Sequence, residues 1–186
     1  MVAAMANFLY VDNSSFAIGG MQVAAVARGI APDIWAAMEH GILDYGWRAD
    51  FGKLYNFAGG DWDGFANLYG SRPRPNDSLW AIAETAGFTV TVHELIRASR
   101  GRQTCATIAR DIMRDSYERM SARKDIITLV AGDADYLPAL EDVVRRGIQF
   151  DVVFWEHAFA DLQSGASTFV ALDPHLDFLA LEQTAD

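Results

Sequence analysis

Uninterrupted apolar runs recur along the chain, and each of them predicts a buried strand of a parallel sheet. The two clearest runs are residues 8–11 and residues 126–131, and an aspartate follows each within two residues. With its flanking residues, the earlier run predicts a first strand at 7–12. Weaker or alternating runs predict further strands at 64–69, 88–93, 149–155 and 168–172.

Between these runs, apolar residues recur at helical spacing, as Leu137, Leu140 and Val143 do. The predicted helices are 21–27, 32–43, 50–55, 77–86, 104–122, 136–146, 158–164 and 174–181. We expect a loop after the first strand that ends at the Gly19–Gly20 pair. Asp50 and Thr104 are expected to cap the helices that follow them.

The alternation of strands and helices predicts right-handed crossovers and a parallel sheet. The chain has 186 residues, the usual size of a single α/β domain, so we expect one domain over 1–186. The net charge of -10 argues against a protein that binds nucleic acid through bulk charge alone. A lone cysteine, the lack of a long apolar run and the lack of a leader-like N-terminus predict a cytoplasmic protein.

Aspartates lie where the two clearest strands end. Asp12 closes the first strand, and Asp133 and Asp135 follow Gly132 at the end of the strand at 126–131. The carboxyl ends of parallel strands form the edge where ligands bind in open α/β sheets. Oxygen ligands grouped in this way suit a hard cation such as Mg²⁺. Capping of the next helix by Asp135 is the alternative interpretation.

These two stretches resemble the NYN family of PIN-like nucleases. The residues that carry the resemblance are Val11-Asp12-Asn13-Ser14-Ser15 and Ala131-Gly132-Asp133-Ala134-Asp135-Tyr136-Leu137-Pro138. The resemblance implies a three-layer, Rossmann-like α/β fold with a mainly parallel sheet of order 3-2-1-4-5 between helices. It also implies metal-dependent cleavage of RNA, with Mg²⁺ or Mn²⁺ as the cofactor.

By position, the family's acids correspond to Asp12, Asp111, Asp133 and Asp135, which we expect to be the catalytic residues. Asp12, Asp133 and Asp135 are the expected metal ligands. We expect the four carboxylates to lie within about 10 Å of one another, a span that hydrated metal ions can bridge. Two positions depart from the family pattern, because Cys105 replaces a helix-start acid and Ser15 replaces an asparagine. A thiol is a poor ligand for Mg²⁺, so weak metal affinity is expected.

Substrate contacts are expected from two loops. Asn13, Ser14 and Ser15 can donate hydrogen bonds to a phosphate or a metal-bound water. Arg97, Arg100 and Arg102 form the basic stretch of an otherwise acidic chain and suit phosphate contact. A solvated loop is the alternative interpretation of these arginines.

The sequence lacks the P-loop, dinucleotide-binding, nucleophile-elbow and zinc-protease motifs, so other enzyme classes fit less well. The resemblance to the NYN family implies a ribonuclease, with single-stranded RNA as the favoured substrate. The alternative is a catalytically weakened or inactive module of the same fold that binds RNA or protein partners. A homo-oligomer is compatible with either function.

Overall fold

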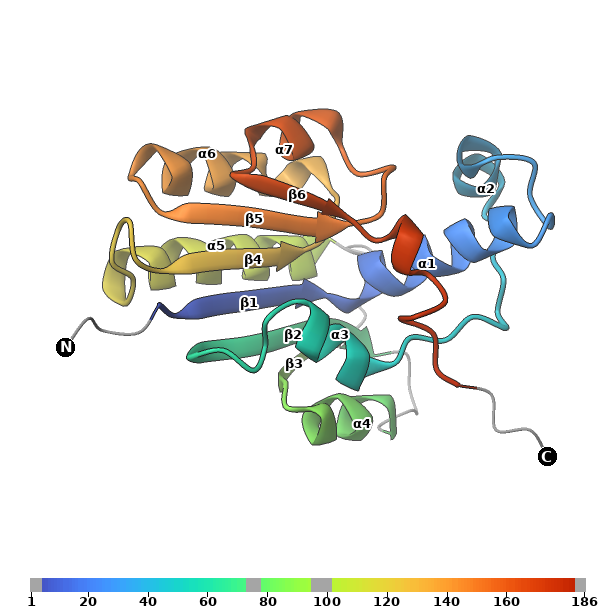
Figure 1. The fold of residues 1–186 in the computed structure, drawn as a ribbon, viewed down its shortest axis with the longest axis horizontal. Helices are drawn as coiled ribbons and strands as arrows, with labels where there is room; N and C mark the ends of the chain where they lie inside the picture. The colour runs from blue at the N-terminus through green and yellow to red at the C-terminus, as the bar shows by residue number, and fades with distance from the viewer. Residues whose placement is uncertain (1–4, 73–77, 95–101, 183–186) are drawn as a thin grey trace.

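A computed structural model describes residues 5–72, 78–94 and 102–182, without the side chains of residues 72, 94 and 102. Its six strands form one sheet of order β3-β2-β1-β4-β5-β6, in which every neighbouring pair is parallel (Figure 1). The strands are β1 (Asn7–Asp12), β2 (Gly64–Arg72), β3 (Thr89–Glu94), β4 (Ile126–Val130), β5 (Gln149–Phe154) and β6 (Thr168–Ala171). The predicted order of five strands is thus confirmed, and β6 adds a sixth strand beside β5.

Helices connect the strands and cover both faces of the sheet. They are α1 (Asn13–Ala27), α2 (Ile34–His40), α3 (Phe51–Phe57), α4 (Ser78–Ala86), α5 (Arg102–Glu118), α6 (Leu137–Arg145) and α7 (Ala160–Gly165). Two short 3₁₀ turns, η1 (Ala134–Tyr136) and η2 (Asp173–His175), complete the described elements. The expected class, an α/β fold with a parallel sheet between helices, is confirmed.

Alternation along β1 divides its side chains between the two helical layers. On one face, the Tyr10 hydroxyl donates to Asp115 of α5 over 2.8 Å. On the other face, the Asn7 amide donates to the carbonyls of Ala58 and Gly59, at the end of α3. β1 is buried along its whole length, which explains why its sequence reads as an apolar run.

Helix α1 begins directly after β1, so the prediction of a loop ending at Gly19 and Gly20 is wrong. Asp12 is both the last strand residue and the helix N-cap, because its carboxylate accepts from the Ser15 N–H. The two glycines lie inside the helix, where a β-carbon would overlap the rings of Trp155 and Trp47. Close packing of aromatic rings, rather than a turn, requires glycine here.

Two other helix predictions need correction. α5 begins at Arg102 and ends at Glu118, so Thr104 lies inside the helix and is not its N-cap. The helix predicted at 174–181 is reduced to η2, because the backbone of this segment bonds partly to itself, as from the Leu179 N–H to the His175 carbonyl, and partly to the chain before α3. The Asp50 N–H donates to the Leu179 carbonyl, and the Leu181 N–H donates to the Arg48 carbonyl. Asp50 caps α3 as predicted, by accepting from the Lys53 N–H.

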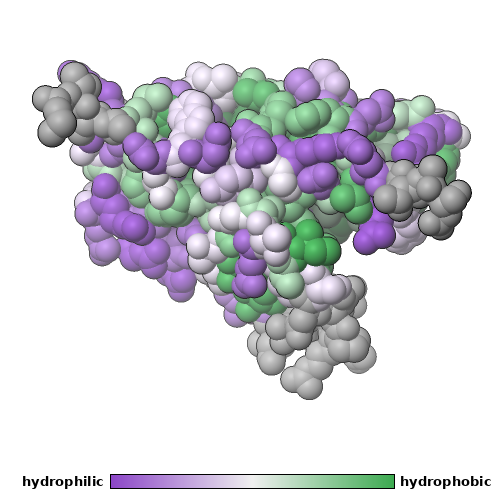
Figure 2. Space-filling view, turned by 60° about the horizontal axis from the view of Figure 1, so that its bottom comes forward, coloured by the Kyte–Doolittle hydropathy of each residue, from purple (hydrophilic) through white to green (hydrophobic). Residues whose placement is uncertain are grey.

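The surface is mainly hydrophilic, as the net charge of -10 requires. Figure 2 shows one face, on which hydrophilic residues are interspersed with apolar ones. Of the helices in the described part of the chain, none is long and apolar enough to cross a membrane.

Candidate active site

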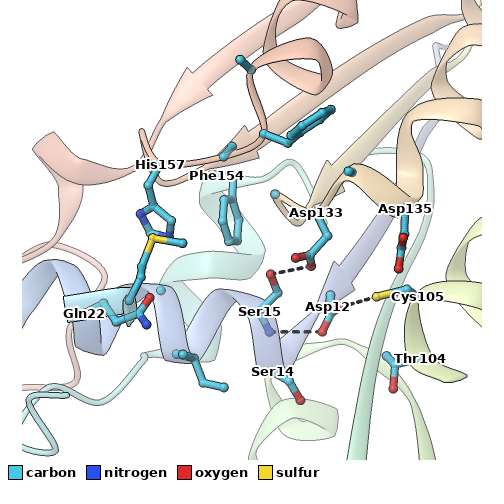
Figure 3. Close-up of a pocket in the computed structure, with 18 of the residues that line it drawn as sticks. Asp12, Ser14, Ser15, Gln22, Thr104, Cys105, Asp133, Asp135, Phe154 and His157 are labelled. Atoms are coloured by element: carbon cyan, nitrogen blue, oxygen red, sulfur yellow. Dashed lines mark hydrogen bonds between the residues drawn. The ribbon is translucent and has the colours of Figure 1, made fainter. Parts of the chain in front are cut away.

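A cavity of about 730 Å³ opens at the carboxyl edge of the sheet, beyond the ends of β1 and β4 (Figure 3). Here the strand order reverses, because the chain adds β2 and β3 on one side of β1 and places β4 on the other. Ligands of open α/β sheets bind at such a switch point. The cavity therefore lies where the sequence places its acids.

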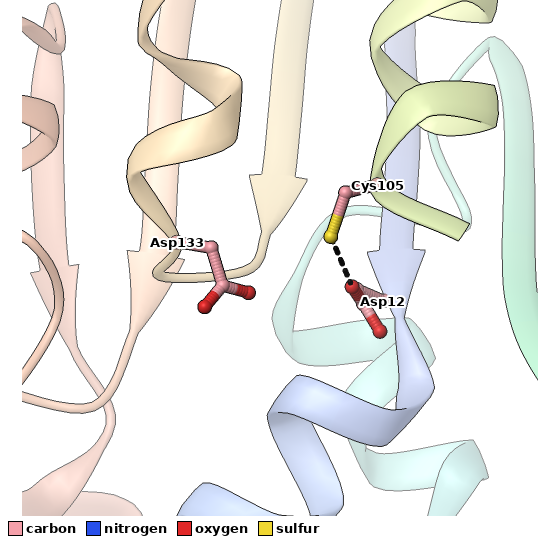
Figure 4. A group of neighbouring side chains, drawn as sticks. All are labelled: Asp12, Cys105 and Asp133. Carbon is pink, nitrogen blue, oxygen red and sulfur yellow. Dashed lines mark hydrogen bonds between the residues drawn. The ribbon is translucent and has the colours of Figure 1, made fainter. Parts of the chain in front are cut away.

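The floor of the cavity brings together the ends of three elements. Asp12 comes from β1, Asp133 from the turn after β4, and Cys105 from the first turns of α5 (Figure 4). One ligand atom of each residue lies within 4.8 Å of the other two. The Ser15 hydroxyl donates to Asp133 over 3.1 Å and so joins α1 to the turn after β4.

Gly132 shapes the turn that carries Asp133. A β-carbon at this position would overlap the ring of Phe154, so the turn lies directly on β5. The Gly132 carbonyl also accepts from the Phe159 N–H over 2.8 Å, which ties the turn to the loop after β5. Asp133 is consequently held at the cavity while its side chain stays exposed.

Asp12 is buried, with 3% of its surface exposed. Its carboxylate accepts from the Ser15 N–H over 3.2 Å, the Tyr136 hydroxyl over 2.9 Å and the Cys105 thiol over 3.7 Å. Burial raises the pKa of Asp12, and the charge of Asp133 adds to this effect, while the three hydrogen bonds oppose it. Within the described part of the chain, no basic side chain bonds to this carboxylate.

Cys105 faces the acids, as predicted, and is buried beside them. Burial raises the pKa of the Cys105 thiol to about 12, since the carboxylates of Asp12, Asp133 and Asp135 add to the effect of desolvation. A hydrogen bond with Tyr136 acts in the opposite direction. The thiol is therefore neutral at pH 7 and acts as a donor to Asp12.

Asp135 and Ser14 also line the cavity. The capping role that was the alternative interpretation of Asp135 does not occur. Asp133 and Tyr136 occupy the N-cap positions of η1 and α6, and neither makes a side-chain capping bond. Asp135 projects from an exposed position next to Asp133. Three carboxylates, from Asp12, Asp133 and Asp135, thus border one cavity.

The structure does not bring Asp111 into this group. Asp111 follows Cys105 by six residues, roughly 9 Å along the axis of α5. Its carboxylate accepts from the Tyr69 hydroxyl over 2.9 Å and forms ion pairs with Arg110 and Arg114 at 3.0 and 3.1 Å. These partners compensate the charge of Asp111. Its burial beside an apolar stripe is therefore explained by hydrogen bonds and ion pairs that support the fold.

The residues predicted to contact the substrate do not all lie at the same cavity. Ser14 and Ser15 line the acidic cavity, whereas Asn13 lines a separate, mostly apolar cavity of about 260 Å³. Arg97 and Arg100 lie outside the described residues. Arg102 is the first residue of α5, and its side chain is not described.

Several residues that line the cavity were missed by the sequence prediction, among them Gln22, Trp35 and His157. Gln22 follows Ser15 by seven residues, so the two share a face of α1. That signal was hidden because the helix was predicted to begin at residue 21. Trp35 and His157 enter the cavity from α2 and the loop after β5, for which no motif gave a signal.

An all-parallel sheet with an acidic cavity at its switch point is the architecture of a nuclease-like α/β domain. The chain belongs to the NYN domain family, whose model matches residues 37–173. The match includes Cys105 and Asp133 and begins after the strand that carries Asp12.

Among the solved structures with a similar fold is a protein of unknown function, VPA0982, from Vibrio parahaemolyticus RIMD 2210633. The alignment covers 97% of this chain and 99% of that chain, with a TM-score of 0.68 and 17% sequence identity. At this identity the similarity concerns the fold alone. No curated protein matches the sequence.

Proposed function

We propose that the protein is a metal-dependent ribonuclease that hydrolyses phosphodiester bonds in single-stranded RNA. The observation that carries the proposal is the group formed by Asp12, Cys105 and Asp133, whose ligand atoms lie within 4.8 Å of one another. Membership of the NYN domain family supports it, since the family has a nuclease-like fold.

The donor set fits a divalent cation. Asp12 is a buried acid with no basic partner among the described residues, an arrangement that is costly unless a proton or a cation compensates it. Carboxylate oxygens are the ligands that Mg²⁺ and Mn²⁺ prefer. Asp12 and Asp133 would hold the ion, with Asp135 as a third oxygen ligand. When bound, such an ion supplies the charge that activates a water and stabilises the leaving oxygen.

The protein's own groups would complete the reaction. Asp135 is exposed in the cavity, where its carboxylate can orient the attacking water and accept its proton. The hydroxyls of Ser14 and Ser15 can donate to a phosphate oxygen at the same edge. Arg97, Arg100 and Arg102 directly precede Thr104 and Cys105, which line the cavity, and so remain candidates for phosphate contact.

Asp111 enters the proposal as a positioning residue rather than a catalytic one. Its bond to Tyr69 of β2 fixes α5 against the sheet, and its pairs with Arg110 and Arg114 of the same helix balance its charge. α5 in turn places Cys105 beside Asp12.

The test is a cleavage time course on a labelled single-stranded RNA with Mg²⁺, with Mn²⁺ and with chelator. We expect cleavage only with metal, and its loss in Asp133→Asn but not in Asp61→Asn, an exposed acid outside the cavity. If calorimetry detects metal binding that depends on Asp133 but RNA stays intact, the chain is the non-catalytic binding module instead.

A further inference from the structure

Beyond the acids, the cavity has a second part with a different character. Its walls include Trp35 and Met38 of α2 and Phe159 from the loop after β5. Trp35 is 67% exposed and Phe159 is 42% exposed. Within the described part of the chain, neither ring stacks on another ring or on a cation. Two large aromatic faces are therefore free to contact a ligand.

An unpartnered amide lies in the same part of the cavity. Gln22 is only 8% exposed, yet its side chain makes no hydrogen bond to any described residue. Figure 3 shows its amide group on the cavity side of α1, in the same region as His157. The Nδ1 atom of His157 is buried and has no hydrogen-bond partner in the described part of the chain. A buried polar atom without a hydrogen bond is costly, so His157 points to a ligand that supplies one, and the Gln22 amide on the same wall can donate to or accept from that ligand.

The charge of the cavity limits what this ligand can be. Its described lining contains three aspartates and neither lysine nor arginine. An anionic backbone would gain nothing from these walls except through a bound cation. Aromatic faces and a neutral amide are instead suited to bind an uncharged, planar ring that has hydrogen-bonding groups along its edge.

We propose that this part of the cavity is a nucleobase subsite, in which a base of the RNA stacks on Trp35 and pairs its edge with the Gln22 amide. Stacking on aromatic side chains and hydrogen bonds to base edges are the means by which proteins bind unpaired bases. Ser15 and Gln22 lie two turns apart on one face of α1, roughly 10 Å along its axis. A nucleotide whose phosphate lies at the acids would place its base there.

This inference rests on the proposed function, and its first test compares two ligands that differ only in the base. Calorimetry in saturating Mg²⁺ should show that AMP binds at least roughly fivefold more tightly than ribose 5-phosphate, the lower limit for one stacked base. Trp35→Ala should abolish the difference. Trp62→Ala, which removes a ring that is 50% exposed but outside the cavity, should preserve it. Equal affinity for the two ligands, or an unchanged preference in Trp35→Ala, would overturn the subsite.

Adenosine separates this inference from the proposed function, because it needs no metal. Titrated in chelator, adenosine should bind the native protein and fail to bind Trp35→Ala, even if the protein proves unable to bind Mg²⁺. If Mg²⁺ binds normally but adenosine does not bind, the metal site stands and the subsite is rejected.

Gln22→Leu tests the role of the amide. Since the Gln22 side chain forms no hydrogen bond to a described residue, an apolar side chain of similar size should not lower the melting temperature, while it should change the ratio of AMP to UMP affinity threefold or more. Gln163 is the matched control, because its amide donates to the carbonyls of Glu156 and Ala158. Gln163→Leu should lower the melting temperature. A lowered melting temperature in Gln22→Leu with an unchanged affinity ratio would make Gln22 a structural residue.

Discussion

At the level of single residues, the chemistry of the cavity depends on how Asp12 is neutralised. Its carboxylate has hydrogen-bond donors in Ser15, Tyr136 and Cys105, but all of them are neutral groups. Hydrogen bonds of this kind compensate burial only in part, since the pKa of Asp12 is still raised. The environment therefore favours a proton or a cation on this carboxylate.

The first prediction concerns the pH dependence of stability without metal. A carboxyl group whose pKa is raised by folding contributes stability at low pH and loses it as the pH rises through the raised value. Ionised Asp12 should thus destabilise the protein near neutral pH, and Asp12→Asn should be the more stable of the two in chelator. The difference in the free energy of unfolding between Asp12→Asn and the native protein should disappear as the pH falls towards 3.8, the ordinary carboxyl pKa. Urea unfolding at several pH values measures this difference, and a difference that is independent of pH would contradict the prediction.

The second prediction concerns Cys105, which contributes a neutral thiol beside Asp12 and Asp133. Cys105→Asp should add a hard oxygen ligand and strengthen Mg²⁺ binding about tenfold, or roughly 1.4 kcal/mol. It should also raise the rate of RNA cleavage and lower the melting temperature in chelator, because a further acid beside Asp12 and Asp133 would add to their repulsion. Cys105→Ser is the control and should change Mg²⁺ affinity little. Calorimetric titration measures the Mg²⁺ affinity of both proteins. Equal affinity in Cys105→Asp and the native protein would count against a metal site at Asp12 and Asp133.

The sequence predicted the site residues that end strands and failed for those that depend on neighbours. Asp12 and Asp133 follow buried strands, so parallel pairing alone brings them to one edge. Asp111 resembles a site acid in sequence, because it borders an apolar stripe. Its partner Tyr69 of β2 becomes visible only once α5 is placed on the sheet.

At the level of elements, strands were easier to predict than helix ends. β1 and β4 are buried on both faces, so each appears in the sequence as an uninterrupted apolar run. The start of α1 has no such pattern, since Asn13, Ser14 and Ser15 are typical of loops. In the structure these residues begin a helix that Asp12 caps. The segment at 174–181 has helical periodicity, but only part of its backbone bonding is local, and Leu179 and Leu181 bond to residues 48–50.

The third prediction follows from the packing of α1. In Gly19→Ala, the added methyl group would overlap the Trp155 ring, whose Nε1 donates to the Phe16 carbonyl. We expect a destabilisation of about 1–3 kcal/mol, the usual cost of overpacking. Gly52→Ala in α3 is the comparison, because its new methyl group would meet only the Asp50 side chain, at 3.3 Å. Chemical denaturation should therefore rank Gly19→Ala as the less stable variant, and the reverse order would show that the rings can move.

At the level of the whole molecule, an acidic chain concentrates part of its charge in one cavity. The net charge of -10 would oppose the approach of RNA, so a divalent ion bound as proposed would act both on the stability of the fold and on the binding of the substrate. The parallel sheet was predictable from the alternation of strands and helices, whereas the strand order that creates the switch point was expected only from the resemblance to the NYN family. The second part of the cavity was not, because α2 and the loop after β5 form walls whose position depends on tertiary packing.

The fourth prediction is a global response to metal. Mg²⁺ or Mn²⁺ at 100 times its Kd should stabilise the fold by about 2.7 kcal/mol. For a domain of this size, this corresponds to a rise in melting temperature of roughly 5–10 °C. Asp133→Asn should reduce the rise, whereas Asp61→Asn should retain it. A melting temperature of the native protein that is the same with and without divalent ions would falsify the metal site.

The cluster is assembled from distant parts of the chain, and this has a consequence for folding kinetics. Ser15 and Asp133, which share a hydrogen bond, are 118 residues apart in sequence, and they meet only when β1 pairs with β4. Long-range parallel pairing is slow and delays contacts of this kind. A divalent ion should therefore slow unfolding several-fold while leaving the refolding rate almost unchanged, since a contact absent from the transition state acts on unfolding alone. Stopped-flow measurements with Mg²⁺ and with chelator would show on which side of the folding barrier the acids come together.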